Sequence, residues 1–317
     1  MKKLDSANDD GKRKIWTMVK ILIVLFIFAV LIAAFFNNND DVVTGYNTAI
    51  IPIKGEITTE SSAGSSPLLP SSDVASSPEV IANIEKAKAD PNIKAVIFEI
   101  DSPGGSPVAT DEISQEIKSL HENNITTVAW IRETGASGAY WIASSTDHIV
   151  ANRMSVVGSI GVIGSYIEWY GLMKDYNVTY KRLVSGEYKD TGTPYRPMTP
   201  SEDVMIQSKL DKLHEYFIQS VSDNRHMNYS SVKVLATGEI FLGVEAKDNG
   251  LIDELGGKAE AIKYIEDKKD ITVTTKEFVK SRSFIESLAF AMNRNSYYIG
   301  QGIASGLVKD DGLKITT

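Results

Sequence analysis

The amino-acid sequence predicts an α/β fold built around a parallel sheet, and two observations carry that prediction. Apolar runs at 48–57, 94–100 and 126–131 indicate three buried strands, and helical patterns of apolar residues separate them. Strand, helix, strand, helix, strand at this spacing predicts parallel pairing with right-handed crossovers. The chain has 317 residues, which is long enough to bury such a core.

Serine followed by proline marks where the helices of this layer begin. Ser77 with Pro78 predicts one helix start, and Ser106 with Pro107 predicts the next. Farther along, apolar residues on one helical face predict a long helix over 201–227. These elements continue the α/β pattern beyond the third strand.

Composition excludes several classes of function. The chain has no cysteine, so disulfides, a thiol nucleophile and Cys-ligated zinc are excluded. It has 33 basic and 41 acidic side chains, and this acidic balance argues against nucleic-acid binding. The glycines at 158, 161 and 164 do not fit the dinucleotide fingerprint, and we find no P-loop, H-E-x-x-H or EF-hand pattern. We therefore expect no cofactor and no metal.

An apolar segment near the N-terminus predicts a membrane anchor over 15–36. Every residue from 21 to 36 is apolar, and the 22 positions span about 33 Å at 1.5 Å per residue. The alternative is a cleaved signal peptide, whose apolar region is normally about 7–15 residues and ends in small residues, whereas Phe35 and Phe36 end this one. Basic residues precede the span and Asn and Asp follow it, so the positive-inside rule predicts a cytoplasmic N-terminus and an exported domain.

Two glycine-containing turns are candidates for chemistry. In the first, DSPGGSP at 101–107, Gly104 and Gly105 permit a sharp turn with positive φ beside a helix start. Backbone N–H groups fixed in such a turn suit an oxyanion hole, although an ordinary strand-to-helix turn has the same composition.

The second turn, ETGASGAYWIAS at 133–144, places Ser137 between Gly135 and Gly138 just after the third strand. It partly resembles the nucleophile elbow G-x-S-x-G, but Ala139 occupies the last glycine position. The alternative interpretation is a serine that caps a short helix.

A nucleophilic serine needs a base, and the sequence offers two kinds. None of His121, His148, His214 and His226 has a context that favours catalysis. A lysine that is neutral because of desolvation is the other option, but periodicity does not identify which lysine.

Several ordered motifs identify the chain as similar to the signal peptide peptidase SppA family of membrane-anchored serine proteases. They are DSPGG at 101, ASGAYWIA at 136, VGSIGVI at 157, SGEYKD at 185, PYRPMTPSE at 194 and GEIFLGVEAKDNGLIDELGG at 238. The resemblance implies a fold of repeated ββα layers like that of Clp protease and crotonase. It also implies Ser137 as nucleophile, Lys189 as general base, and the N–H groups of Gly105 and Gly138 as the oxyanion hole.

Two features qualify this transfer. The loop reads ASGAY where the family commonly has ASGGY. Asp190, next to the base, would favour the protonated lysine unless its carboxylate points away or is solvated.

The resemblance further implies an activity and an assembly. The chain resembles the short form of the family, with one catalytic repeat and a homo-oligomeric ring in which subunits share each Ser–Lys pair. The separation of Ser137 and Lys189 permits a dyad in cis or in trans. We expect degradation of cleaved signal peptides and other short unfolded hydrophobic peptides at the outer face of a prokaryotic cytoplasmic membrane. The alternatives are a crotonase-like acyl-CoA enzyme and a catalytically idle peptide-binding scaffold.

The predicted organisation divides the chain into five parts. They are a cytoplasmic tail over 1–14, the anchor over 15–36, a linker over 37–47, the peptidase domain over 48–280 and a C-terminal tail over 281–317. Within the domain, the Ser-, Gly- and Pro-rich segment 58–77 predicts a mobile loop.

Overall fold

A computed structural model of the chain describes residues 16–29, 45–60 and 74–278. The chain divides into two units, of which Gly45–Ser281 is the larger, and Met1–Thr44 with Arg282–Thr317 make up the other. The described part of the smaller unit is a helix over 16–29 with exposed side chains. The predicted C-terminal tail over 281–317 lies outside the described residues.

The membrane anchor stays a prediction. Within the described residues, no helix combines the length and the apolar character needed to cross a bilayer. The helix over 16–29 covers about 21 Å at 1.5 Å per residue. Residue 15 and residues 30–36 of the predicted span lie outside the described part of the chain.

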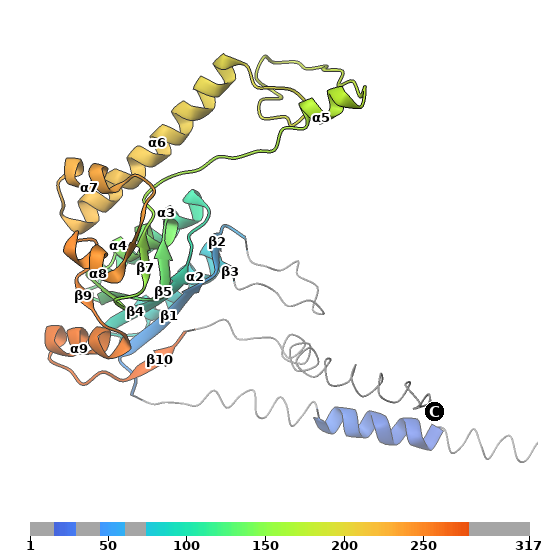
Figure 1. The fold of residues 1–317 in the computed structure, drawn as a ribbon. Helices are drawn as coiled ribbons and strands as arrows, with labels where there is room; N and C mark the ends of the chain where they lie inside the picture. The colour runs from blue at the N-terminus through green and yellow to red at the C-terminus, as the bar shows by residue number, and fades with distance from the viewer. Residues whose placement is uncertain (1–15, 30–44, 61–73, 279–317) are drawn as a thin grey trace, which may run out of the picture. The chain divides into compact units, whose positions relative to one another are not determined.

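An eight-stranded sheet forms the centre of the larger unit (Figure 1). Its strand order is β10-β1-β4-β5-β6-β9, with β7 paired to β5 and β8 paired to β7. All pairs are parallel except β7 with β8, which confirms the predicted α/β class with a largely parallel sheet. The strands are β1 (Thr48–Lys54), β4 (Ala95–Ser102), β5 (Thr126–Ala136), β6 (His148–Ala151), β7 (Val156–Gly158), β8 (Ile240–Leu242), β9 (Glu254–Leu255) and β10 (Thr275–Glu277).

The helices begin close to where Ser and Pro predict. Ser106 is the N-cap of α3 and its side chain accepts a hydrogen bond from the Ala109 N–H, whereas the first helix is capped at Ser76 instead of Ser77. The long helix predicted over 201–227 is α6. The helices are α2 (Ser77–Ala89), α3 (Pro107–Glu122), α4 (Gly138–Ser144), α5 (Tyr170–Asp175), α6 (Pro200–Arg225), α7 (Tyr229–Leu235), α8 (Gly243–Asp248) and α9 (Lys258–Lys269).

The segment expected to be a mobile loop over 58–77 is in part a strand. Val74–Ser76 forms β3, which pairs in parallel with β2 (Glu56–Thr58). Ile57 of β2 also forms a bridge to Gly105, so this small sheet continues directly into the glycine turn after β4. Residues 61–73 of the predicted loop lie outside the described residues.

Two apolar layers pack on the central sheet. On one face, buried side chains of α2, α3, α4 and the C-terminal part of α6 form a continuous core with the strands. On the other face, Ala261 and Ile265 of α9 pack on Ile97 and Val128. Between β4 and β5, Ser102 lies opposite Gly135, so the turns that follow these two parallel strands meet at the same edge of the sheet.

Candidate active site

Ser137 occupies a strained turn between a buried strand and a buried helix. It follows the last residue of β5 and precedes the first residue of α4, with φ 54° and ψ −127°. A positive φ at a non-glycine residue costs about 1–3 kcal/mol and persists only where the surroundings enforce it. Here the Ser137 N–H donates to the Gly158 carbonyl at 2.8 Å, and the Ser137 carbonyl accepts the Tyr140 N–H at 2.9 Å.

This backbone favours the nucleophile over the helix-cap interpretation. Ser137 stands at the N-cap position of α4, but its side chain makes no capping hydrogen bond. The side chain is half-buried, and a strand-to-helix turn of this strained kind projects a serine hydroxyl outward. The partial match to the nucleophile elbow in the sequence therefore has a structural counterpart, even with Ala139 in place of glycine.

Gly104 packs directly against this turn. It has φ 96°, and a Cβ atom added there would lie 2.7 Å from the Gly138 nitrogen and 2.9 Å from the Ser137 Cβ. Gly105 has no room for a side chain either, because its added Cβ would lie 2.1 Å from the Ile57 carbonyl oxygen. The two glycine turns that the sequence singles out thus form one closely packed site.

Two backbone donors in this site have no acceptor among the residues that the structure describes. Within the described residues, neither the Gly105 N–H nor the Gly138 N–H makes a hydrogen bond. The Gly105 nitrogen would lie 3.5 Å from a Cβ atom added at Gly138, so the two residues are neighbours. Adjacent, unoccupied N–H groups beside a projecting serine are what stabilisation of an oxyanion requires.

Lys189 lies in a different region of the same unit. It is exposed, and it belongs to residues 162–199, called the arm below, which carry α5 and lead into α6. Figure 1 shows the arm at the N-terminal end of α6, away from the sheet. The C-terminal part of α6 is the part that contacts the sheet layer, since Phe217 stacks on Trp141 of α4 with ring centroids 5.0 Å apart.

The length of α6 separates the two predicted catalytic residues. Phe217 lies 17 residues beyond Pro200, which is about 25 Å along the helix axis at 1.5 Å per residue. No hydrogen bond or ion pair within the described residues joins the Lys189 amine to another group, and none joins it to Ser137. A single chain brings together Ser137, Gly105 and Gly138, but it does not bring Lys189 to them.

The carboxylate of Asp190 is engaged away from Lys189. Arg182 donates to it at 2.7 and 2.8 Å, and Arg196 donates to it at 2.9 and 3.1 Å. Hydrogen bonds from these two guanidinium groups hold the pKa of the Asp190 carboxyl well below its usual range, and Arg182 has the larger effect. Arg196 also binds Glu202, which forms a capping box with Thr199 at the start of α6. No sequence pattern predicts this network, because its residues are scattered over the arm and α6.

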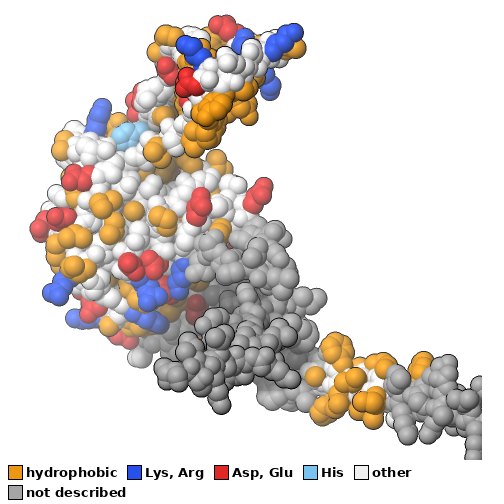
Figure 2. Space-filling view, turned by 45° about the vertical axis from the view of Figure 1, so that its right-hand side comes forward, with side chains coloured by type: hydrophobic (Ala, Val, Ile, Leu, Met, Phe, Trp, Pro, Cys, Tyr) orange, Lys and Arg blue, Asp and Glu red, His pale blue; other side chains and the backbone are white. Residues whose placement is uncertain are grey.

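The arm and the exposed side of α6 present a large apolar surface. Ile163, Leu183 and Tyr176 are 85%, 83% and 76% exposed. Figure 2 shows hydrophobic side chains gathered on the arm. Contiguous exposed apolar surface of this kind marks an interaction site. Further exposed members are Tyr166, Ile167, Trp169, Tyr170, Leu172, Val178, Val184, Tyr188, Tyr195, Val204 and Tyr216.

The histidines have other environments. The His121 ring lies 2.9 Å from the Thr127 hydroxyl, and His148 stacks on Tyr264 with ring centroids 3.9 Å apart. His226 ends α6 in a left-handed conformation. No hydrogen bond or ion pair within the described residues connects a histidine to Ser137, although the Nε2 atom of His214 is buried without a partner there.

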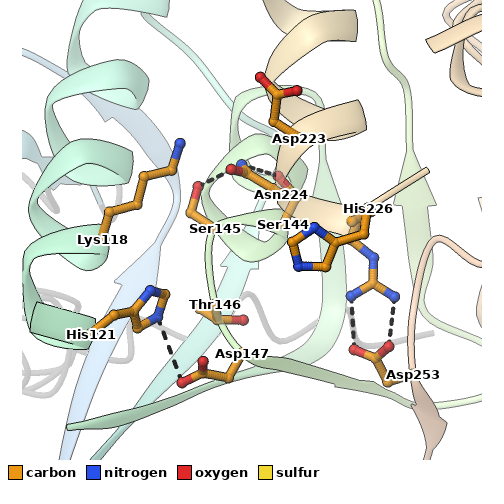
Figure 3. Close-up of a pocket in the computed structure, with 11 residues that line it drawn as sticks. Lys118, His121, Ser144, Ser145, Thr146, Asp147, Asp223, Asn224, His226 and Asp253 are labelled. Carbon is orange, nitrogen blue, oxygen red and sulfur yellow. Dashed lines mark hydrogen bonds and ion pairs between the residues drawn. The ribbon is translucent and has the colours of Figure 1, made fainter. Parts of the chain in front are cut away.

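A polar cavity of about 490 Å³ lies at the opposite end of α4 from Ser137. Its polar groups bind one another (Figure 3): Asn224 donates to the hydroxyls of Ser144 and Ser145, and Arg225 pairs with Asp253 at 2.7 Å. Its basic side chains stand at the C-terminal ends of helices, where cations offset the helix dipole. These contacts give Asn224, Arg225 and Asp253 structural roles in joining α6 to the sheet layer. Within the described residues, no group of three or more His, Asp or Glu side chains could hold a metal ion.

The Peptidase family S49 model matches residues 119–272, which include Ser137 and Lys189. A presumed protease of Methanocaldococcus jannaschii is 32% identical over 224 residues, covering 71% of this chain and 70% of that protein.

Two further relatives are matched over less of their own length. A presumed signal peptide peptidase SppA of Enterococcus faecium is 31% identical over 75% of this chain and 65% of that protein. Protease 4 of Haemophilus influenzae is 32% identical over 59% of this chain and 31% of that protein. The matched part therefore spans less than two thirds of these two proteins. The chain belongs to the SppA family of proteases, peptidase family S49.

Proposed function

We propose that the chain is a membrane-anchored serine endopeptidase in which Ser137 is the nucleophile and Lys189 the general base. Its substrates would be cleaved signal peptides and other short, unfolded, hydrophobic peptides. The observation that carries this proposal is the strained Ser137 turn beside two N–H groups, those of Gly105 and Gly138, that have no acceptor within the described residues. Family membership supports the proteolytic class of the reaction.

The proposed reaction has two halves. The Lys189 amine takes the proton from the Ser137 hydroxyl as Oγ attacks the peptide carbonyl, and the oxyanion accepts hydrogen bonds from the N–H groups of Gly105 and Gly138. The tetrahedral intermediate then collapses, the peptide C–N bond breaks, and the leaving amine takes the proton from Lys189. Water, deprotonated by Lys189, attacks the acyl-serine and releases the second product with the serine restored.

We further propose that a second copy of the chain completes each site. Within one chain, Lys189 sits on the arm at the far end of α6, while Ser137 lies in the sheet layer. The exposed apolar side chains of the arm and α6 would then be covered by a neighbouring subunit. A closed homo-oligomeric ring satisfies both requirements for every subunit at once.

The proposed setting is the outer face of a prokaryotic cytoplasmic membrane, and the proposed fold is the repeated ββα arrangement of Clp protease and crotonase. The parallel sheet with a nucleophile turn at its carboxyl edge supports the fold. The apolar run from 21 to 36 after a basic N-terminus supports the topology. Protease added to intact spheroplasts should digest the domain after residue 37. Protection of that domain, or release of a soluble form cut near residue 34, would contradict the topology.

The function is tested by acylation of the serine. A fluorescent serine-protease probe that acylates its target should label the wild-type protein, with label incorporated in proportion to the activity lost, whereas Ser137→Ala should give no label. Ser144→Ala is the matched control, because Ser144 lies on the same helix and its buried hydroxyl donates to the Trp141 carbonyl. Wild-type protein without label would favour the acyl-CoA enzyme or the idle scaffold. Equal labelling of Ser137→Ala would place the nucleophile elsewhere.

A further inference from the structure

Thr110 has a buried hydroxyl that forms no hydrogen bond with any described part of the chain. The residue lies in the first turns of α3 and is fully buried. Its Oγ1 atom has no hydrogen-bond partner within the described residues. Such groups are rare in native proteins, because a buried hydroxyl that gives up water without a replacement is destabilising.

The local partner that a helical threonine normally uses does not serve here. A threonine hydroxyl in a helix commonly donates to the carbonyl four residues earlier. That carbonyl, of Ser106, accepts the Thr110 N–H at 3.0 Å but not the hydroxyl. The Ser106 side chain is occupied as well, because it accepts the Ala109 N–H. A valine of the same shape would fit this site without the desolvation cost.

The unpartnered hydroxyl lies under the candidate oxyanion hole. A Cβ atom added at Gly138 would lie 2.4 Å from Thr110 Oγ1 and 3.5 Å from the Gly105 nitrogen. Thr110 Oγ1 therefore lies beside the Gly138 Cα, on the side of Gly138 that also faces Gly105. In the proposed reaction, the N–H groups of Gly138 and Gly105 donate hydrogen bonds to the oxygen on which negative charge develops.

We propose that Thr110 is a positioning residue for the oxyanion hole. This inference rests on the proposed function. The Oγ1 atom is inaccessible, so it acts through Gly138 instead of touching the substrate. Its contact fixes the Gly138 peptide, and its O–H dipole can turn toward the oxyanion when that charge forms, in surroundings of low dielectric where a dipole acts strongly.

The test compares Thr110→Val, which removes the hydroxyl and keeps the shape, with Thr110→Ser, which keeps the hydroxyl. We expect Thr110→Val to lower the single-turnover acylation rate by about 10- to 100-fold, less than the roughly 10²- to 10³-fold lost with a direct oxyanion-hole donor, because Thr110 acts through Gly138. KM should change less than twofold and Tm should stay the same or rise. Thr110→Ser should restore the rate to within about threefold of wild type.

A tetrahedral adduct supplies a second readout. A peptide aldehyde forms a hemiacetal with the nucleophile, and its oxygen occupies the oxyanion hole. Thr110→Val should weaken aldehyde binding by the same factor as kcat/KM, while the affinity of Ser137→Ala for an uncleaved peptide should be unaffected by adding Thr110→Val.

Three results would overturn the inference. The first is a wild-type acylation rate for Thr110→Val. The second is a rate loss that accompanies a fall in Tm and is not rescued by serine, because the hydroxyl would then serve the fold. The third is failure of Thr110→Val to fold, for the same reason. If Ser137→Ala is inactive while Thr110→Val behaves as wild type, only this inference fails. If Ser137→Ala remains active, the proposed function itself fails.

Discussion

The turn around Ser137 and the arm around Lys189 are built on opposite principles. At the turn, the backbone is packed so closely that a Cβ atom added at Gly104 or Gly105 would lie less than 3 Å from a neighbouring atom. Main-chain hydrogen bonds to Gly158 and Tyr140 hold the strained backbone of Ser137. On the arm, Lys189 is exposed, and the neighbouring Asp190 forms partly buried ion pairs with Arg182 and Arg196. In the proposed mechanism, one chain therefore preorganises the nucleophile and the oxyanion donors, and a partner chain supplies the base from its exposed arm.

Several charged side chains near Lys189 form ion pairs with one another, and Lys189 itself is not one of them. The carboxylates of Asp190 and Glu202 balance the charges of Arg182 and Arg196, and the Arg196–Glu202 pair ties the arm to the start of α6. The Lys189 amine takes no part in this network within the described residues. The ion pairs position this segment, and the Lys189 amine stays free of the network, as the proposed role in a neighbouring subunit's site requires.

The largest effect should come from the base. Arginine keeps its proton at every accessible pH, so Lys189→Arg should lower the acylation rate by at least about 10³-fold while keeping the charge of the arm. Lys181→Arg, also exposed on the arm, is the matched control and should stay within twofold of wild type. Single-turnover acylation measures both. If Lys189→Arg turns over normally while His214→Ala is inactive, a histidine is the base and the dyad is wrong.

A smaller but still large effect should come from the packing of the turn. Gly104→Ala puts a Cβ atom 2.7 Å from the Gly138 nitrogen, so the oxyanion donor must move. We expect activity to fall by about 100-fold and stability by about 1–3 kcal/mol, because φ is also positive there. Gly171→Ala, on α5 with nothing within 4 Å of the added Cβ, should leave both unchanged or slightly raise stability. Denaturant unfolding and the peptide cleavage rate should be measured for both variants. Equal losses of stability and activity in Gly104→Ala and Gly171→Ala would contradict the conclusion that the turn is more tightly packed than the arm.

The smallest effect should come from removing the ion pairs that Asp190 forms within the arm. Asp190→Asn removes the carboxylate shared by Arg182 and Arg196, and we expect about a threefold to tenfold loss of activity with little change in the Tm of the sheet layer. Limited proteolysis should cut the arm faster, whereas Asp211→Asn on the exposed side of α6 should not change the cutting rate.

Arg182 and Arg196 also determine the pH range over which their ion pairs with Asp190 stabilise the arm. Because they lower the pKa of the Asp190 carboxyl, its stabilising contribution is present above the unfolded value of about 3.9 and is lost only as pH falls through the lower folded value. The rate at which an added protease cuts the arm of the wild-type protein should therefore be constant between about pH 5 and 8. An arm that loosens on going from pH 7 to 5 would contradict this assignment.

Sequence patterns predict the turn better than the arm. Ser106 with Pro107 and the apolar runs predict α3, β4 and β5, and parallel pairing alone brings their carboxyl ends together. Periodicity carries no information about the positive φ of Ser137, which tertiary packing imposes, or about the unpartnered Thr110 hydroxyl on an otherwise ordinary buried helix face. Lys189 was identified only by resemblance, because an exposed lysine in an irregular segment has no local signal.

If Ser137 and Lys189 of one site come from different chains, as we propose, then assembling two inactive variants together should restore activity. Ser137→Ala and Lys189→Ala should each be inactive alone. Unfolded together in equal amounts and assembled, they should recover about a quarter of the wild-type activity, because a quarter of the shared interfaces then pair an intact serine with an intact lysine. Light scattering should show the recovered activity only in the oligomer. No recovery in well-assembled mixtures, or full wild-type activity in a monomer, would contradict the account.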